Sequence, residues 1–432
     1  MNIGELRSAT SGRILQPSDD AYDQARKIFN GSIERFPAAI AFCRDARDIV
    51  AVVRWAAKNH VRISVRGGGH NVAGRCIADG SVLIDLAHLR DVVISSDGKR
   101  VSVGGGCIWA DVDRATEHVG VAVPGGTVSD TGVGGLTLGG GLGWLLPSYG
   151  LTCDQLQGVQ MVTGTGQIID IDDTSDGELM ACLRGAGHGL GVITEFRFSA
   201  CTIEQPLIGG SLIFDMSAAR DILNTFFDLS CTLSMSIMAS PYIGWSNDSL
   251  VLSIDLACHG DPESLEKFCE VLSRVRPPLK STLRNMSYVE LQSMLDNPSR
   301  RGRKAYWKSV FGLASARPSV EVLVESVEVM PTTDCSLFVE HLHGAFKRPE
   351  TQSVYPLRSS DYDVLFVGSW SAETDERRVR EWATAYAADA FGGRSAQSHY
   401  RNYADVDDTD DLSDLDVVIK VKSRTDPNNL FI

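Results

Sequence analysis

The sequence predicts an α+β protein of two domains, and three observations support this fold class. The chain has 432 residues, more than one hydrophobic core ordinarily organises. In its first half, short strand patterns and helix patterns follow one another irregularly, which argues against a doubly wound parallel sheet. From about Ile203 onward, longer strand candidates are interleaved with helices, which indicates an antiparallel sheet with helices packed on one face.

Local patterns define the elements of the first half. Residues 45–60 repeat apolar side chains at helical spacing behind Asp45, a favourable N-cap, so we expect a helix there. A second helix is expected to end at Gly120. Short apolar runs predict strands at residues 37–44, 62–66, 80–89 and 100–109, and a β-hairpin at residues 156–172.

The second half is dominated by strand candidates. Apolar and β-branched runs predict strands within residues 211–216, 233–245, 249–260, 319–330, 335–346 and 363–370. We therefore expect one domain over residues 1–202, a second over residues 203–393, and a return of the chain to the first domain over residues 394–432.

Composition excludes several classes of protein. The formal net charge of −14 argues against nucleic acid or an anionic membrane as a partner, and it is typical of a soluble surface. No signal peptide and no membrane-spanning apolar run is recognised. The ten cysteines are scattered without a C-x-x-C pair, so we expect reduced thiols and a cytoplasmic location. His341 and His343 are the one close histidine pair and lack further ligands, so no metal site is expected.

Two glycine-rich tracts, residues 64–74 and 124–154, carry the strongest functional signal. Glycine lets the backbone approach a ligand closely, and this density predicts a flat, phosphate-bearing cofactor lying on bare main chain beside His70. The chain contains no G-x-G-x-x-G motif and no G-x-x-x-x-G-K-[ST] motif. A Rossmann dinucleotide site and an ATP or GTP P-loop are therefore not supported.

Five motifs in order give the chain a family resemblance. They are RGGGHN (66–71), a glycine core from Gly125 to Trp144, YGLTCD (149–154), RGAGHGLGVITEF (184–196) and DPNNLF (426–431). Together they resemble the berberine-bridge-enzyme and 6-hydroxynicotine-oxidase branch of the vanillyl-alcohol oxidase flavoproteins. The resemblance implies a two-domain FAD-binding fold of that type, in which residues 203–393 form the substrate domain.

The resemblance also implies how FAD is held. His70 matches the histidine that the family links to the flavin 8α-methyl carbon, and Val128 stands where many members carry a second linking cysteine. A single covalent bond through His70 is therefore expected, and Cys153 is interpreted as an inert core thiol. The other expected cofactor contacts are Arg66, Gly67, Gly68, Gly69, Asn71, Gly74, Gly125, Gly126, Thr127, Asp130, Thr131, Gly134, Gly135, Leu138, Gly140, Gly141, Gly143, Trp144, Tyr149, Gly150, Gly191, Val192 and Asn402.

Some of these positions have particular expected roles. The resemblance places Asp130 and Thr131 beside the N5 and O4 edge of the flavin, although ordinary turn chemistry also explains them. Val192 matches a residue whose main chain meets the adenine. Trp144 is expected near the mouth of the substrate pocket. The sequence departs from the family at His188 and His343, among other positions, which blurs the substrate site.

Three residues are candidates for the catalytic base. In the family a tyrosine near a Y-x-N-Y motif often takes the substrate proton, and HYRNY supplies Tyr400 and Tyr403 around Asn402. A free tyrosine titrates near pH ~10, so this role needs a neighbour that alters its pKa. Glu340 is the other candidate, because strand alternation puts it on one face with Phe338, where apolar surroundings would raise its pKa.

The expected activity is an oxidase that transfers hydride from an alcohol, amine or phenolic secondary metabolite to flavin N5, with O2 as acceptor and H2O2 as product. Three alternatives stay open: a flavin-dependent oxidative or redox-neutral cyclase, a binding protein that has lost its chemistry, and a flavin-independent hydrolase or other enzyme. The expected partners are a small-molecule substrate and O2, with the protein as a monomer or homodimer.

Overall fold

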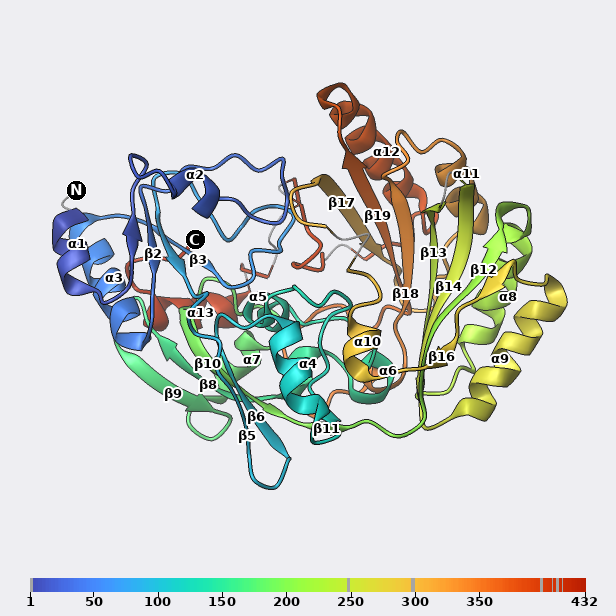
Figure 1. Cartoon of the computed structure of the whole chain (residues 1–432), viewed down its shortest axis with the longest axis horizontal. Coiled ribbons are helices and arrows are strands. Elements are labelled where there is room, and N and C mark those ends of the chain that lie inside the picture. The colour runs from blue at the N-terminus through green and yellow to red at the C-terminus, as the bar shows by residue number, and fades with distance from the viewer. Residues whose placement is uncertain are drawn as a thin grey trace.

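The computed structural model describes residues 3–246, 249–296, 300–396, 399–405, 407–408, 412–413 and 415–432. Two bodies of sheet and helix face each other across the middle of the molecule (Figure 1). One contains the two sheets of the first half of the chain, and the other contains a large antiparallel sheet from the second half. The predicted α+β fold class is confirmed, while the domain boundaries after residues 202 and 393 stay predictions.

Two sheets organise the first half. The first contains, in order, β1 (Ile14–Leu15), β2 (Ala39–Phe42), β4 (Val82–Asp85) and β3 (Ile63–Arg66), with β2, β4 and β3 parallel. The second is antiparallel and contains β5 (Val92–Ile94), β6 (Arg100–Gly104), β10 (Val192–Ser199), β8 (Leu156–Val162) and β9 (Ile168–Asp172). A further pair joins β7 (Val121–Ala122) to β11 (Cys201–Thr202). The predicted strands and the hairpin of this half are confirmed.

Helices cover these sheets. Asp45 caps α3 (Ala46–Asn59), because its carboxylate accepts hydrogen bonds from the backbone N–H groups of Arg47 and Asp48. The apolar face of α3 is buried against the first sheet, as its spacing predicts. The other helices of this body are α1 (Ile3–Ala9), α2 (Tyr22–Ala25), α4 (Trp109–Glu117), α5 (Val133–Leu138), α6 (Leu146–Tyr149) and α7 (Gly177–Leu183).

The second body is an eight-stranded antiparallel sheet. Its strands are, in order, β15 (Lys280–Ser281), β12 (Leu207–Asp215), β14 (Ser249–His259), β13 (Ile237–Ser246), β18 (Ser336–His341), β19 (Tyr362–Trp370) and β17 (Lys304–Phe311), with β16 (Arg284–Asn285) also on β12. Its helices are α8 (Ala219–Ser230), α9 (Pro262–Val275), α10 (Tyr288–Gln292), α11 (Val320–Glu328) and α12 (Glu376–Asp389). One face, which includes Leu337, Val339 and Val364, packs on α8, α9, α11 and α12, so the other face is left for the first body (Figure 1).

The prediction of a strand at residues 319–330 is wrong, because this segment forms α11. Its β-branched composition favours a strand, but Val320, Leu323, Val324 and Val327 recur at helical spacing and are all buried. The Ser319 side chain accepts a hydrogen bond from the backbone of Val322 and caps the helix. Periodicity therefore prevails over the intrinsic preference of valine here.

The chain returns to the first body after the large sheet. Helix α13 (Asp416–Thr425) packs on α7, and Phe431 bridges to Ile63 of β3 in a parallel arrangement. The buried carboxylate of Asp426 accepts hydrogen bonds from the backbone N–H groups of Leu430 at 2.9 Å and Phe431 at 3.0 Å. Within the described residues, no helix combines the length and apolarity that a membrane span needs.

Replacing Asp426 with alanine is expected to lower the free energy of unfolding by about 2 kcal/mol, because two buried backbone donors would lose their acceptor. Chemical denaturation monitored by circular dichroism measures the effect. Asn428→Ala, at an exposed neighbouring position, serves as the control. Equal stability of the two variants would show that the Asp426 carboxylate does not hold the returning segment.

Candidate functional site

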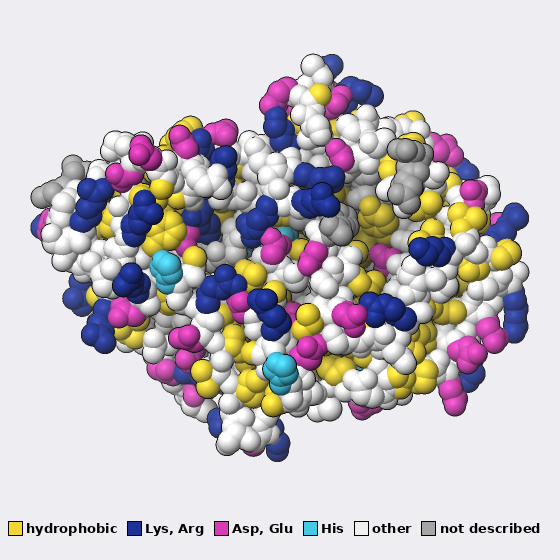
Figure 2. All heavy atoms as spheres, in the orientation of Figure 1, with side chains coloured by type: hydrophobic (Ala, Val, Ile, Leu, Met, Phe, Trp, Pro, Cys, Tyr) yellow, Lys and Arg dark blue, Asp and Glu magenta, His cyan; other side chains and the backbone are white. Residues whose placement is uncertain are grey.

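A cavity of about 950 Å³ lies between the two bodies. This volume is at the upper end of the range that small-molecule and cofactor sites occupy. One wall is glycine-rich main chain of the first body, and another is the open face of the large sheet. On the face of the molecule drawn in Figure 2, basic and acidic side chains are interspersed, as on an ordinary solvated surface.

Two glycine loops meet backbone to backbone in the first wall. Gly67, Gly68 and Gly69 follow β3, and Gly132 precedes α5. A Cβ atom on Gly68 would lie 2.3 Å from the backbone nitrogen of Gly132, so no other residue fits without displacing main chain. The result is a surface of bare peptide groups, which a flat dinucleotide such as the expected FAD can approach closely.

His70 is held from two sides. Its ring stacks on that of Phe29, with centroids 3.9 Å apart, and its Nε2 lies 3.1 Å from Oδ1 of Asp130. Arg301 donates from Nε to Oδ2 of Asp130 at 2.6 Å and also to the carbonyl oxygen of Gly68 at 2.6 Å. Burial would raise the pKa of Asp130, but the hydrogen bond from His70 and the charge and hydrogen bond of Arg301 lower it below its ordinary value.

Arg66 supports this arrangement from behind the cavity. It is buried, forms an ion pair with Asp85, and donates to the carbonyl oxygens of Ala25 and Lys27. These bonds fix the segment that carries Phe29, whose backbone N–H donates to the carbonyl oxygen of Gly69 at 2.9 Å. Arg66 therefore acts on the ring partner of His70 and does not line the cavity.

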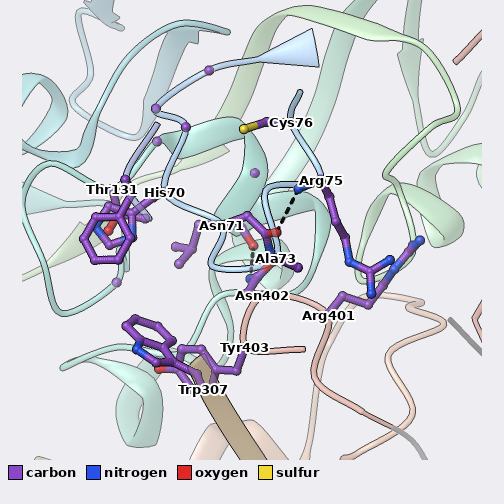
Figure 3. A pocket seen from close by; sticks show the side chains of 18 of the residues that line it. His70, Asn71, Ala73, Arg75, Cys76, Thr131, Trp307, Arg401, Asn402 and Tyr403 are labelled. Atoms are coloured by element: carbon purple, nitrogen blue, oxygen red, sulfur yellow. Dashed lines mark hydrogen bonds between the residues drawn. The ribbon is translucent and has the colours of Figure 1, made fainter. Parts of the chain in front are cut away.

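The opposite wall is formed by one face of the large sheet. Alternation along each strand brings the same face inward, through Ala305 and Trp307 on β17, Ser336 and Phe338 on β18, and Leu365, Val367 and Ser369 on β19. Tyr403 lies on this wall with its ring edge-on to Trp307 at 5.8 Å between centroids. Figure 3 draws both side chains together, with His70 and Thr131 on another wall of the pocket.

A buried pair of carboxyl groups lies behind Tyr403. Glu340 and Asp363 are register partners on β18 and β19, and both carboxyl groups are buried. Burial, reinforced by the charge of Asp363, raises the pKa of Glu340, and burial raises the pKa of Asp363 as well. The Tyr403 hydroxyl donates to Oε1 of Glu340 at 3.5 Å, the long end of hydrogen-bond geometry. The expected sharing of a face by Phe338 and Glu340 is confirmed, although Glu340 itself does not line the cavity.

Tyr400 serves a different purpose from Tyr403. Its buried hydroxyl accepts hydrogen bonds from the backbone N–H groups of Gly141 and Leu142, both at 3.1 Å, and from the Asn402 side chain at 2.8 Å. Burial raises the pKa of Tyr400, and it does not line the cavity. Its hydroxyl therefore fixes the glycine core, so the geometry favours Tyr403 over Tyr400 as a group that meets a substrate.

Many of the expected cofactor contacts lie around the cavity. Those that line it are Gly67, Gly68, Gly69, His70, Asn71, Gly126, Thr127, Val128, Thr131, Gly134, Gly135, Leu138, Gly191 and Asn402. Those that do not are Arg66, Gly74, Gly125, Asp130, Gly140, Gly141, Gly143, Trp144, Tyr149, Gly150 and Val192. Trp144 is not at the pocket mouth, because its ring is buried in an apolar cluster with Leu207, Met238 and Tyr288.

Several lining residues lie outside the expected set. Phe29, Cys76, Tyr242, Trp307 and Arg303 line the cavity, yet none belongs to a glycine motif. Trp307 and Phe338 alternate with residues of the opposite face of the sheet. This period-two pattern in the sequence shows which residues share a face, but it does not show which face lines the cavity. Arg301 joins the His70 network from a segment more than 200 positions away, and no local pattern indicates that contact.

The remaining expectations concern cysteines and histidines. Cys153 is buried away from the cavity, and burial raises its pKa, as expected of an inert thiol. His188 lines the cavity, with its Nε2 3.0 Å from the carbonyl oxygen of Gly135. His341 and His343 stack with ring centroids 4.1 Å apart. In the part of the chain that the structure describes, no group of three side chains suited to a metal ion occurs.

Comparisons with known proteins agree with this geometry. Residues 37–172 match the family model of an FAD binding domain. An FAD-linked oxidoreductase of Dictyostelium discoideum is 26% identical over 99% of this chain and 95% of its own. (R)-6-hydroxynicotine oxidase of Paenarthrobacter nicotinovorans is 33% identical over 54% of this chain and 51% of its own. The solved structure of a berberine-bridge-enzyme-like protein variant of Physcomitrella patens superposes with a TM-score of 0.90, at 21% identity over 100% of this chain and 98% of that one.

Gly68→Ala is expected to lower the flavin content of the purified protein at least about tenfold, because the new Cβ would force the two glycine loops apart. Absorbance of the flavin relative to protein measures this content. Gly177→Ala is the matched control, since a Cβ there meets nothing within 4 Å and the residue lies outside the cavity. Full flavin content in Gly68→Ala would contradict the role of the loop contact.

Proposed function

Because the chain belongs to the berberine-bridge-enzyme and 6-hydroxynicotine-oxidase-like FAD-linked oxidoreductases, we propose that it is an oxidase of a small secondary-metabolite substrate. When bound, FAD supplies a hydride acceptor that passes its electrons to O2 and yields H2O2. The observation that carries the proposal is the position of Tyr403, which lies in the cavity wall and is backed by two buried carboxyl groups.

In this proposal Tyr403 receives the substrate proton and Glu340 is the final proton acceptor. Burial and the charge of Glu340 raise the pKa of Tyr403, so the free phenolate does not form readily. The hydroxyl can instead receive a proton from the substrate and pass its own to Glu340, whose raised pKa suits it as an acceptor. Asp363, the register partner of Glu340 on the next strand, is itself held by a hydrogen bond from Ser309 at 2.7 Å.

The cavity walls indicate the kind of substrate. Trp307, Phe338 and Tyr242 provide aromatic surface on the sheet side, and Ser336 and Ser369 add hydroxyl groups. Such a wall favours a flat, mostly apolar molecule whose oxidisable carbon bears an oxygen or a nitrogen. We therefore propose an alcohol, an amine or a phenolic compound as donor.

The cofactor would be held mainly by main chain, with one covalent bond. His70 is the proposed attachment point, and Val128, which lines the cavity, provides no thiol for a second bond. Asn71 and Asn402 provide polar side chains near the middle of the same cavity (Figure 3). The protein would carry out this chemistry in the cytoplasm, as a monomer or homodimer.

Acid precipitation tests the attachment. Flavin should stay with the precipitated wild-type protein and raise the denatured mass by one FAD, whereas His70→Ala should release all of its flavin. A panel of alcohols, amines and phenols, assayed for H2O2 release and for flavin bleaching without oxygen, then tests the activity. Bleaching without H2O2 on readmission of air would refute the oxidase and favour another acceptor.

Tyr403→Phe is expected to lower kcat/KM by about 10²–10³-fold, because the substrate proton would lose its path to Glu340. Steady-state kinetics on the best substrate of the panel measure the loss, and the covalent flavin content should be unchanged. Tyr386→Phe on α12, away from the cavity, is the control. Unchanged kinetics in Tyr403→Phe would remove this residue from the reaction.

The pH dependence of kcat/KM should report the carboxyl pair. The Glu340–Asp363 pair titrates in two steps, and below the lower of its two raised pKa values both carboxyl groups are protonated and neither can accept a proton. We therefore expect kcat/KM to rise as pH increases through that pKa. Glu340→Gln should lower kcat/KM and abolish this rise, because the amide does not titrate. A rise that persists unchanged in Glu340→Gln would assign the pH dependence to another group.

A further inference from the structure

The ring nitrogens of His70 are not equivalent. Nε2 faces the Asp130 carboxylate at 3.1 Å, and in the part of the chain that the structure describes Nδ1 has no hydrogen-bond partner. A carboxylate can only accept, so the hydrogen bond requires the proton of a neutral imidazole to be on Nε2. Nδ1 then carries the free lone pair, which a nucleophile requires.

Asp130 is itself held in place. Arg301 donates a hydrogen bond to its Oδ2 at 2.6 Å and another to the carbonyl oxygen of Gly68, two residues before His70. The segment next to Arg301 is anchored to the partner of the His70 ring, because the backbone N–H of Gly302 donates to the carbonyl oxygen of Phe29 at 2.8 Å. The imidazole is thus fixed by a stacked ring on its face and by a braced carboxylate at its edge.

We infer that Asp130, braced by Arg301, is a positioning residue for covalent attachment of the flavin to Nδ1 of His70. This inference rests on the proposed covalent linkage and adds residues that serve it. Asp130 presents the reactive tautomer, and its negative charge stabilises the positive charge that the imidazole acquires as Nδ1 forms its bond.

The attachment balances as follows. One C–H bond breaks at the flavin 8α carbon and one N–C bond forms at Nδ1. The 8α carbon gives up one proton and the imidazole gives up another. These two protons and the electron pair of the broken C–H bond together account for the two hydrogens that the reduced flavin ring has gained. Dioxygen then removes both as H2O2 and leaves the oxidised, attached cofactor. Asp130 gains and loses nothing overall, as a positioning residue should.

The test separates attachment from binding. Apoprotein is produced in riboflavin-starved cells, FAD is added, and the rate at which flavin becomes acid-precipitable is followed at saturating FAD. Asp130→Ala should slow this rate by about tenfold or more, and Asp130→Asn, which keeps an acceptor for Nε2 without the charge, should fall between Asp130→Ala and the wild type. Arg301→Met, at an exposed position, should slow it less than Asp130→Ala.

Two controls make the result specific. Ser129→Ala changes the neighbouring side chain, which bonds Asp296 and not His70, and it should leave the rate unchanged. FAD affinity is compared between His70→Ala and the His70→Ala/Asp130→Ala double variant by fluorescence quenching, and the two should agree within about threefold. A purely structural role for Asp130 would lower affinity and leave the rate at saturating FAD unchanged.

Each outcome decides the inference. A slower rate with preserved affinity supports it, and an unchanged rate at saturating FAD overturns it while leaving the His70 linkage intact. Complete release of flavin from the wild-type protein by acid overturns the linkage itself and this inference with it. If Asp130→Ala does not fold, Asp130→Asn and Arg301→Met carry the same test, and unchanged rates in those two variants refute the role.

Discussion

The contact of two peptide backbones at Gly68 and Gly132 is the constraint on which the rest of the site depends. It joins the loop after a parallel strand to the start of a short helix, with no side chain between them. Because the loops touch, His70 and Asp130 come within hydrogen-bonding distance although 60 positions separate them. Arg301 then bonds to both sides of this junction, through Asp130 and the carbonyl oxygen of Gly68. The glycine wall and the oriented imidazole are therefore one structure.

The opposite wall obeys the simpler geometry of a pleated sheet. One face of the eight-stranded sheet is packed on helices, so its other face is available to a ligand. Along β18 that face carries Ser336, Phe338 and Glu340, which pass from the cavity into the interior behind Tyr403. The same strand thus supplies both pocket surface and a buried carboxyl group, the combination on which the proposed proton transfer depends.

Local patterns predicted much of this protein, and long-range contacts account for most of what they missed. The helix behind Asp45 and the hairpin at 156–172 follow from spacing and caps that lie within a few residues. The strand predicted at residues 319–330 was wrong, because the prediction gave more weight to the valine content than to the helical spacing of the apolar residues in the same segment. The expected position of Trp144 at the pocket mouth was wrong, since a tryptophan in a glycine-rich tract can turn to either side, and here it packs on Met238 and Tyr288 of the other body. Arg301 and Phe29 reach His70 only through tertiary structure.

The cavity also sets an order of events during biosynthesis. Its lining comes from segments near residues 29, 70, 130, 190, 307, 338, 367 and 403, and the segment that pairs with β3 extends to Phe431. When only the glycine tracts have been translated, one wall of the cavity is present, and the wall that contains Trp307 and Tyr403 has not yet been synthesised. The binding surface is therefore complete only after translation has passed all of these segments.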